Sequence, residues 1–273
     1  MDGQQEAAQD AAVPMGNGAA PPAPVPPWWA PAALAWSFLT ALPAPRVAAA
    51  PATLAAAVGL FPLVGAVLGA LIGGLGLVLD LLWPAGPTAA ALLAAAALST
   101  GGLHLDGLMD AADGIFGGQS IERRLAIMRD SRVGAFGVAA GSLALLAQYA
   151  CLSALVGIDR LRALTAAAVV SRWAMVAAAA AFPSARAAGL GAVFRDAVGW
   201  GALARATVFA VLIAALAGPL GLAALAVAGA LTILIGRLFV RRLGGLTGDT
   251  YGALAVIVET AVLYLAAAWH RAG

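Results

Sequence analysis

The stretch AAAVGLFPLVGAVLGALIGGLGLVLD, residues 55–80, contains a single charged residue, and that residue is its last. About 20 apolar residues in a helix cover the hydrocarbon core of a bilayer, so this stretch can cross a membrane. Within it Gly65, Gly69 and Gly73 recur every four residues, a spacing that lets another helix approach closely. Six further stretches have a similar character: 87–103, 134–157, 163–183, 201–217, 219–238 and 252–270. The sequence therefore predicts an all-α, polytopic integral membrane helical bundle of about seven transmembrane helices.

The composition supports this prediction and excludes some classes of function. Of the 273 residues 63% are hydrophobic and 10% charged, whereas about 25% are charged in soluble domains. All 15 basic residues are arginine, which excludes a Walker A phosphate loop and a Schiff-base lysine because both need an amine. The arginines are spread among the loops, so no nucleic-acid partner is expected. The one cysteine, Cys151, lies in an apolar run and is expected to be a small buried residue.

The N-terminal part of the chain differs from the rest. Residues 1–27 are rich in Ala, Gly and Pro and poor in large apolar groups, which predicts a disordered tail. Residues 28–273 are expected to form a single helical membrane domain. Its first segment, 28–45, is too short to cross a bilayer comfortably, and its three tryptophans suit an interfacial or re-entrant helix at headgroup level.

The arginines predict how the bundle lies in the membrane. Counted through alternating loops, eleven arginines fall on one side, and Arg160, Arg162 and Arg271 fall on the other. The positive-inside rule makes the first side cytoplasmic. The expected location is the bacterial cytoplasmic (inner) membrane, multi-pass, with the polar segments 104–132, 184–200 and 241–252 on the cytoplasmic face. Polar groups gathered at one surface favour an enzyme, with its active site facing the cytoplasm, over a transporter.

The segment HLDGLMDAADGIFGGQSIERRLAIMRDSR, residues 104–132, concentrates charge in an otherwise apolar chain. Asp106, Asp110 and Asp113 follow an i, i+4, i+7 spacing, which places them within an arc of roughly 60° on one helix face. Three carboxylates on one stripe repel each other unless a cation lies between them, and Mg²⁺ is such a cation. A solvated acidic face is the alternative, but no basic residue occurs between Asp106 and Asp113.

A second charged group follows directly. Arg129, Asp130 and Arg132 lie just before the third apolar stretch. Two guanidinium groups at i and i+3 can hold phosphate oxygens in bidentate fashion. The alternative is a positively charged anchor at the start of a membrane helix.

Three more charged residues lie in or near the apolar stretches. Arg172 falls well inside the fourth stretch, where it needs either an acidic partner from another helix or a polar substrate cleft. Glu259 falls inside the last stretch and could pair with Arg172, or complete a second metal site with Asp249 ten residues before it. His104 projects from the opposite helix face to Asp113 and is expected to be a structural hydrogen-bonding residue at the membrane surface.

The polar motifs resemble those of the cobalamin synthase family. They are GGLHLDGLMDAADG at 101–114 and MRDSRVGAFG at 128–137, with FLTALP at 38–43 and GGLTGD at 244–249. The resemblance runs from about residue 34 to 270. Family members are membrane-bound adenosylcobinamide-GDP ribazoletransferases that require Mg²⁺.

The resemblance implies a reaction and roles for the residues above. A hydroxyl of α-ribazole, or of its 5′-phosphate, attacks the cobinamide-side phosphorus of adenosylcobinamide-GDP. Adenosylcobalamin, or its 5′-phosphate, forms and GMP leaves. Asp106, Asp110 and Asp113 would hold Mg²⁺, with one as general base, and Arg129 and Arg132 would bind the diphosphate. Asp130, Asp249 and Glu259 would orient these groups or hold a second metal, and Arg172 would contact substrate. The oligomeric state, including a homo-oligomer, stays open.

Two other classes fit parts of the pattern. CDP-alcohol phosphotransferases and prenyltransferases also use Asp-rich helices with Mg²⁺, but the former have Ala-Arg three residues after their first Asp-Gly. Here Asp106-Gly107 is followed by Leu-Met-Asp-Ala, without that arginine. An ion-coupled transporter with carboxylate cation sites is the third alternative, and acids at mid-membrane would support it.

Overall fold

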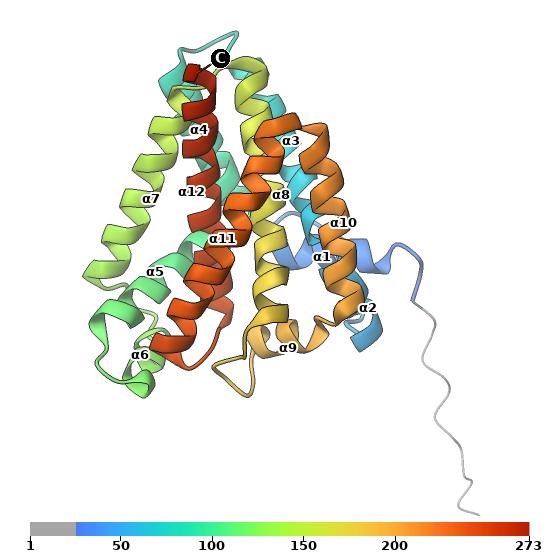
Figure 1. Ribbon diagram of the computed structural model, residues 1–273, viewed down its shortest axis with the longest axis vertical. Coiled ribbons are helices and arrows are strands. Elements are labelled where there is room, and N and C mark those ends of the chain that lie inside the picture. The colour runs from blue at the N-terminus through green and yellow to red at the C-terminus, as the bar shows by residue number, and fades with distance from the viewer. Residues whose placement is uncertain (1–25, 273) are drawn as a thin grey trace, which may run out of the picture.

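The computed structural model describes residues 26–272, so all but the last two residues of the predicted tail at 1–27 lie outside the described residues. The described chain is a helical bundle (Figure 1). Its helices are α1 Ala30–Leu39, α2 Pro51–Val58, α3 Phe61–Leu79, α4 Ala85–Ser99, α5 Leu103–Gly117, α6 Ile121–Ile127, α7 Ala135–Ser153, α8 Gly157–Ala181, α9 Leu190–Ala197, α10 Trp200–Leu216, α11 Gly218–Leu243 and α12 Gly248–Ala272.

The prediction of a polytopic helical membrane bundle is confirmed. Five helices are long and apolar enough to cross a bilayer by themselves: α3, α7, α8, α11 and α12. Two bent pairs raise the number of candidate spans to seven. The axes of α4 and α5 meet at 86°, and those of α9 and α10 at 88°.

The first predicted span is divided in the structure. Residues 55–58 belong to α2, and a new helix, α3, begins at Phe61. Pro62 lies in the first turn of α3, where its missing N–H costs nothing because the first N–H groups of a helix have no intrahelical acceptor. The chain therefore crosses with the 19 residues of α3 instead of the whole of 55–80.

The fourth span begins six residues earlier than predicted. The reason is that Arg160, which was predicted to lie in a loop, is neutralised inside the bundle. The side chain of Arg160, in the second turn of α8, is 1% exposed and lies 2.6 Å from an oxygen of Asp80. Its Nε donates to the backbone oxygen of Leu152 at 3.1 Å. A paired and hydrogen-bonded arginine can be buried where a lone one cannot.

The glycines at four-residue spacing bring α3 directly against α8. A Cβ atom on Gly65 would clash with the backbone oxygen of Ala168, and one on Gly69 would lie 2.6 Å from the Cα of Thr165. A Cβ on Gly73 would lie 2.7 Å from the Cα of Leu161. Only glycine lets the two backbones approach so closely. The four-residue spacing of the glycines therefore has a packing role.

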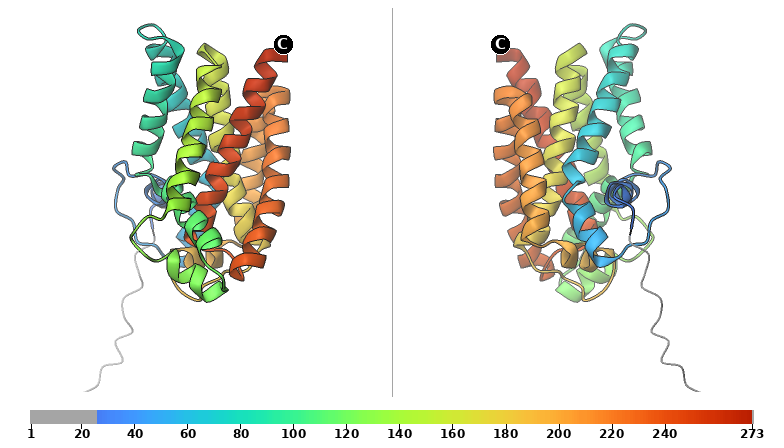
Figure 2. Two further views of the ribbon diagram at one scale, coloured as in Figure 1. Left: turned by 90° about the vertical axis from the view of Figure 1, so that its left-hand side faces the viewer. Right: turned by 90° about the vertical axis from the view of Figure 1, so that its right-hand side faces the viewer.

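The N-terminal helix α1 lies across the bundle, as the two side views of Figure 2 show by presenting it end-on beside upright helices. Its ten residues are too few to cross a bilayer, which agrees with the predicted interfacial or re-entrant helix. An aromatic cluster fixes it in place. Phe38 of α1 lies 5.4 Å from Phe61 of α3 and 5.8 Å from Phe194 of α9, and Phe194 lies 5.0 Å from Tyr251 of α12, centroid to centroid.

The three polar segments meet at one end of the bundle, as predicted. Helices α5, α6 and α9 lie at the end opposite the C-terminus (Figure 1). The basic pair Arg241 and Arg242 ends α11 there, and Arg124 of α6 donates to the backbone oxygen of Arg242 at 3.0 Å. Charge and loop structure are therefore concentrated where α5 approaches α12.

Candidate active site

The predicted carboxylate helix exists as α5, and a glycine turn sets its direction. Gly101 and Gly102 have φ angles of +61° and +73°, which L-residues with a side chain rarely adopt. They allow the chain to turn sharply between α4 and α5. Asp106 lies in the first turn of α5 and is exposed, and Asp110 follows one turn later and is half-buried.

Asp113, the third member of the stripe, differs from the other two. It is 7% exposed, and its two carboxylate oxygens accept hydrogen bonds from the backbone N–H groups of Gly134 at 2.7 Å and Gly137 at 2.8 Å. Gly134 is the N-cap residue of α7, so the carboxylate satisfies N–H groups at a helix start. Asp113 therefore ties α5 to α7, and its predicted role in metal binding stays a prediction.

Asp249 joins the two remaining aspartates. A Cβ on Gly107 would lie 2.6 Å from the backbone oxygen of Asp249, so the backbones of α5 and α12 touch at this point. Asp110 lies within electrostatic range of Asp106 and Asp249. The three carboxylates form the acidic cluster Asp106–Asp110–Asp249, built from the first two turns of α5 and the first turn of α12.

A pair of loops brings one arginine to the acidic cluster. Ser184 and Leu246 form an isolated parallel bridge, and the N–H of Ala185 donates to the oxygen of Leu246 at 2.8 Å. This contact places Arg186 beside α12, where its Nη1 lies 3.6 Å from Oδ2 of Asp249. Arg186 is not among the site residues predicted from the sequence, although both loops are predicted to lie on one membrane face.

Asp106, Asp249 and Arg186 border a cavity of about 490 Å³, which we call the α9/α12 cavity. The starts of α9, at Gly189, and of α12, at Gly248, both line it, together with Asp106 and Asp249. Helix N-termini present unpaired N–H groups and a partial positive charge, which suit an anion. With Arg186 they give the cavity groups suited to phosphate oxygens, next to the carboxylates of Asp106 and Asp249, which suit a cation.

The charged group before α7 lies apart from this cavity. Oδ1 of Asp130 accepts hydrogen bonds from N and Nε of Arg132, both at 3.0 Å, and Oδ2 accepts one from its Nη2 at 2.8 Å. These bonds lower the pKa of Asp130 to about 2. Arg132 is 87% exposed and pairs with Asp130. Binding of phosphate by Arg129 and Arg132 stays a prediction.

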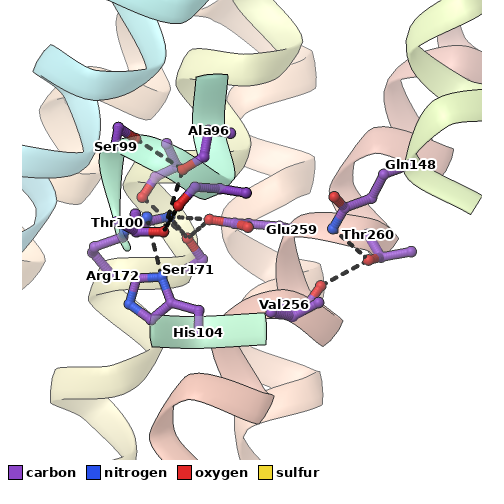
Figure 3. A network of polar contacts seen from close by, with 12 residues as sticks. Ala96, Ser99, Thr100, His104, Gln148, Ser171, Arg172, Val256, Glu259 and Thr260 are labelled. Carbon is purple, nitrogen blue, oxygen red and sulfur yellow. Dashed lines mark hydrogen bonds and ion pairs between the residues drawn. The ribbon is translucent and has the colours of Figure 1, made fainter. Parts of the chain in front are cut away.

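Arg172 and Glu259 pair with each other inside the bundle (Figure 3). Ser171 bridges them, because its Oγ donates to Glu259 at 3.1 Å and accepts from Nη1 of Arg172 at 3.0 Å. The Nη2 of Arg172 lies 3.4 Å from Nδ1 of His104, which is buried. Since arginine only donates, this nitrogen of His104 accepts.

The ion pair selects one of the alternatives left open by the sequence. Arg172 finds an acid on another helix, and Glu259 is not part of a metal site with Asp249, which lies ten residues or about 15 Å away along α12. Both residues border a small interior cavity of about 100 Å³. Direct contact of either residue with substrate stays a prediction.

Among residues 26–272 no group of three or more His, Cys, Asp or Glu side chains is arranged to hold a metal ion by itself. Mg²⁺, however, usually takes one or two carboxylates and completes its shell with waters and substrate phosphate oxygens. Asp106 and Asp110, one turn apart with Asp249 beside them, match that need, so the residues fit the ion.

Comparisons with known proteins agree with the motifs. The family model of cobalamin-5-phosphate synthase matches residues 31–267. A relative from Desulforamulus reducens is 44% identical over 245 residues, covering 85% of this chain and 94% of the relative. Relatives from Roseiflexus sp. and Syntrophobacter fumaroxidans are 40% and 42% identical, covering 86% and 89% of this chain and 90% and 100% of the relatives.

All three relatives carry the name adenosylcobinamide-GDP ribazoletransferase. No solved structure matches the chain. The family match covers every helix that borders the α9/α12 cavity, including all of α5 and most of α12. On this evidence the chain belongs to the cobalamin-5-phosphate synthase family.

Proposed function

We propose that this protein is an adenosylcobinamide-GDP ribazoletransferase that works by Mg²⁺-assisted phosphoryl transfer. Family membership supports the overall reaction. The observation that carries the mechanism is the acidic cluster Asp106–Asp110–Asp249 near Arg186, with Asp106, Asp249 and Arg186 lining the α9/α12 cavity. Carboxylates for a metal on one side and cationic groups for phosphate on the other are the parts that phosphoryl transfer needs.

The reaction is a displacement at phosphorus. The hydroxyl oxygen of α-ribazole, or of its 5′-phosphate, forms a bond to the cobinamide-side phosphorus. The bond from that phosphorus to the bridging oxygen breaks, and its electron pair leaves with GMP. The hydroxyl proton passes to a carboxylate of the acidic cluster. No covalent enzyme intermediate is required, because the acceptor itself is the nucleophile.

The residues of the site divide this work. Arg186 and the N–H groups at the starts of α9 and α12 bind and orient the diphosphate. Asp106, Asp110 and Asp249 would hold Mg²⁺, which offsets negative charge on the transferring phosphoryl group when bound. Asp113 acts through packing, because it fixes α5 against the start of α7.

The location of the site supports an enzyme over an ion-coupled transporter. Asp249 lies in the first turn of α12, at the end of a span, and Asp106 lies beside it. The proposed orientation places this arginine-rich end in the cytoplasm and the spans in the bacterial inner membrane. Labelling of an Ala188→Cys variant by an impermeant maleimide tests this, because the native Cys151 is buried. Labelling is expected in inverted vesicles and not in intact cells.

The reaction is tested with membranes containing the wild type or Asp110→Asn, supplied with adenosylcobinamide-GDP, α-ribazole and Mg²⁺. GMP release should fall by about 100-fold or more in the variant, because a metal ligand loses its charge. Asp159→Asn, which changes an exposed carboxylate at the other end of the bundle, is the control and should retain activity. Wild-type rates from Asp110→Asn would remove the metal assignment. Release of CMP or pyrophosphate from the matching substrates, without GMP, would indicate the rival enzyme classes.

A further inference from the structure

Asp106 also lines a second cavity. It has a volume of about 700 Å³ and lies between α1 and the turn from α4 to α5, so we call it the α1/α5 groove. We propose that the groove is the subsite for the nucleoside acceptor, the benzimidazole riboside that carries the attacking hydroxyl. This inference rests on the proposed function and adds where each of the two substrates binds.

The groove and the α9/α12 cavity share a wall. Ser37 and Phe38 of α1, and Leu103 and Asp106 of α5, line both of them. Asp106 lines the groove, whereas Asp110, Asp249 and Arg186 do not. Asp106 therefore stands at the junction, with the cationic groups on one side of it and the groove on the other.

In-line displacement separates the site of the acceptor from the site of the leaving group. The attacking oxygen, the phosphorus and the leaving oxygen are roughly collinear in phosphoryl transfer. The leaving GMP carries negative charge, which the starts of α9 and α12 and Arg186 attract into the α9/α12 cavity. With the reacting phosphorus at the acidic cluster, the acceptor needs a site at Asp106 other than the one that receives GMP, and the α1/α5 groove is such a site. The corrin macrocycle is a lateral substituent of that phosphorus and is too large for either cavity.

The lining of the groove suits an uncharged ring with a sugar. Phe38, Leu105 and Met109 supply apolar surface, and the hydroxyl groups of Thr40 and Thr100 supply hydrogen-bonding groups. None of the described residues that line it is basic, so the groove offers a phosphate no positively charged partner. An apolar lining with a few polar groups is typical of sites for small heterocyclic ligands.

The inference also accounts for the path of the proton. A ribose hydroxyl in the groove faces Asp106 at the shared wall. As its oxygen bonds to phosphorus, the proton passes to a carboxylate of the acidic cluster, and the bridging electron pair departs with GMP into the α9/α12 cavity. Atoms and charge balance without any further reactant.

Two matched alanines separate the subsites. Ala41 lines only the groove and Ala188 only the α9/α12 cavity, and both are exposed. Ala41→Trp should raise the KM for α-ribazole by about tenfold or more, equal to ~1.4 kcal/mol of lost binding. It should leave the KM for adenosylcobinamide-GDP within about twofold. Ala188→Trp should do the reverse. Ala49→Trp, at an exposed position that lines neither cavity, is the control and should resemble wild type.

Protection from labelling gives a readout that does not depend on turnover. In the full-length protein in detergent, α-ribazole should slow maleimide labelling of Ala41→Cys and leave Ala188→Cys unaffected, and GDP should have the opposite pattern. Equal protection of both positions by α-ribazole, or an unchanged KM for α-ribazole in a folded Ala41→Trp variant, would overturn the subsite assignment. Absence of GMP release from the wild type would instead overturn the proposed function, whatever the labelling shows.

Discussion

Two acids of α12, Asp249 and Glu259, lie ten residues apart, and each is near one arginine. The two pairs differ in how fully the arginine neutralises the acid. Glu259 and Arg172 make a direct ion pair that Ser171 also bonds, and the side chain of Arg172 is 5% exposed. Asp249 and Arg186 are 3.6 Å apart at the edge of an open cavity. The first pair satisfies itself and supports the bundle. The second keeps binding capacity for a ligand, because two further carboxylates compete for the same arginine.

The largest effect is expected at the pair of Asp249 and Arg186. Asp249→Asn removes one charge from the acidic cluster, so GMP release should fall by about 100-fold while the thermal unfolding of the protein changes little. Asp196→Asn, on α9 at the same end of the bundle, changes an exposed carboxylate and serves as the control. Full activity of Asp249→Asn at saturating Mg²⁺ and at low Mg²⁺ alike would exclude Asp249 from the metal site.

Substitution in the pair of Arg172 and Glu259 should instead lower the stability of the protein. Glu259→Gln leaves the charge of Arg172 buried without a counter-charge, at a cost of about 3–5 kcal/mol. Thermal unfolding in detergent, followed by tryptophan fluorescence, measures the loss. The double variant Arg172→Met/Glu259→Met should recover most of it, since an apolar pair needs no counter-charge. A variant with unchanged stability and a raised substrate KM would instead support direct substrate binding by Glu259.

Substitution of Arg186 tests whether the pair of Asp249 and Arg186 binds the diphosphate. Arg186→Gln removes a charged hydrogen bond to the diphosphate worth ~1.5–3 kcal/mol, so the KM for adenosylcobinamide-GDP should rise by about 10- to 100-fold. The KM for α-ribazole should stay near the wild-type value. Arg195→Gln, a partly exposed arginine on α9, controls for the loss of positive charge at this end. Equal changes in both KM values would show that Arg186 acts on the fold of the loop.

The smallest effect is expected at Asp113. Asp113→Asn weakens the cap of α7, which should lower the free energy of unfolding by about 1 kcal/mol. The Mg²⁺ concentration for half-maximal activity should not change, because both carboxylate oxygens already accept backbone N–H groups. A shift of that concentration as large as the shift in Asp110→Asn would return Asp113 to the metal site.

The contrast between Asp113 and Asp249 marks the limit of sequence reasoning about the site. Helical periodicity correctly placed Asp106, Asp110 and Asp113 on one helix. It could not show that the start of α7 covers the third of them, because the loop from Gly118 to Gly134 folds back by contacts between distant residues. The same limit hid Arg186, which reaches Asp249 only through the bridge between residues 184 and 246.

The sequence by itself determined that this protein is a helical membrane bundle, where most of its spans lie and which family its polar motifs resemble. Those properties follow from local hydrophobicity, helix period and motif spacing, which each segment carries alone. Only the tertiary structure decided which charges neutralise each other and which remain available to a ligand. Glycines such as Gly107 decide this through contact, because the absence of a Cβ lets α5 touch α12 and brings separate carboxylates together.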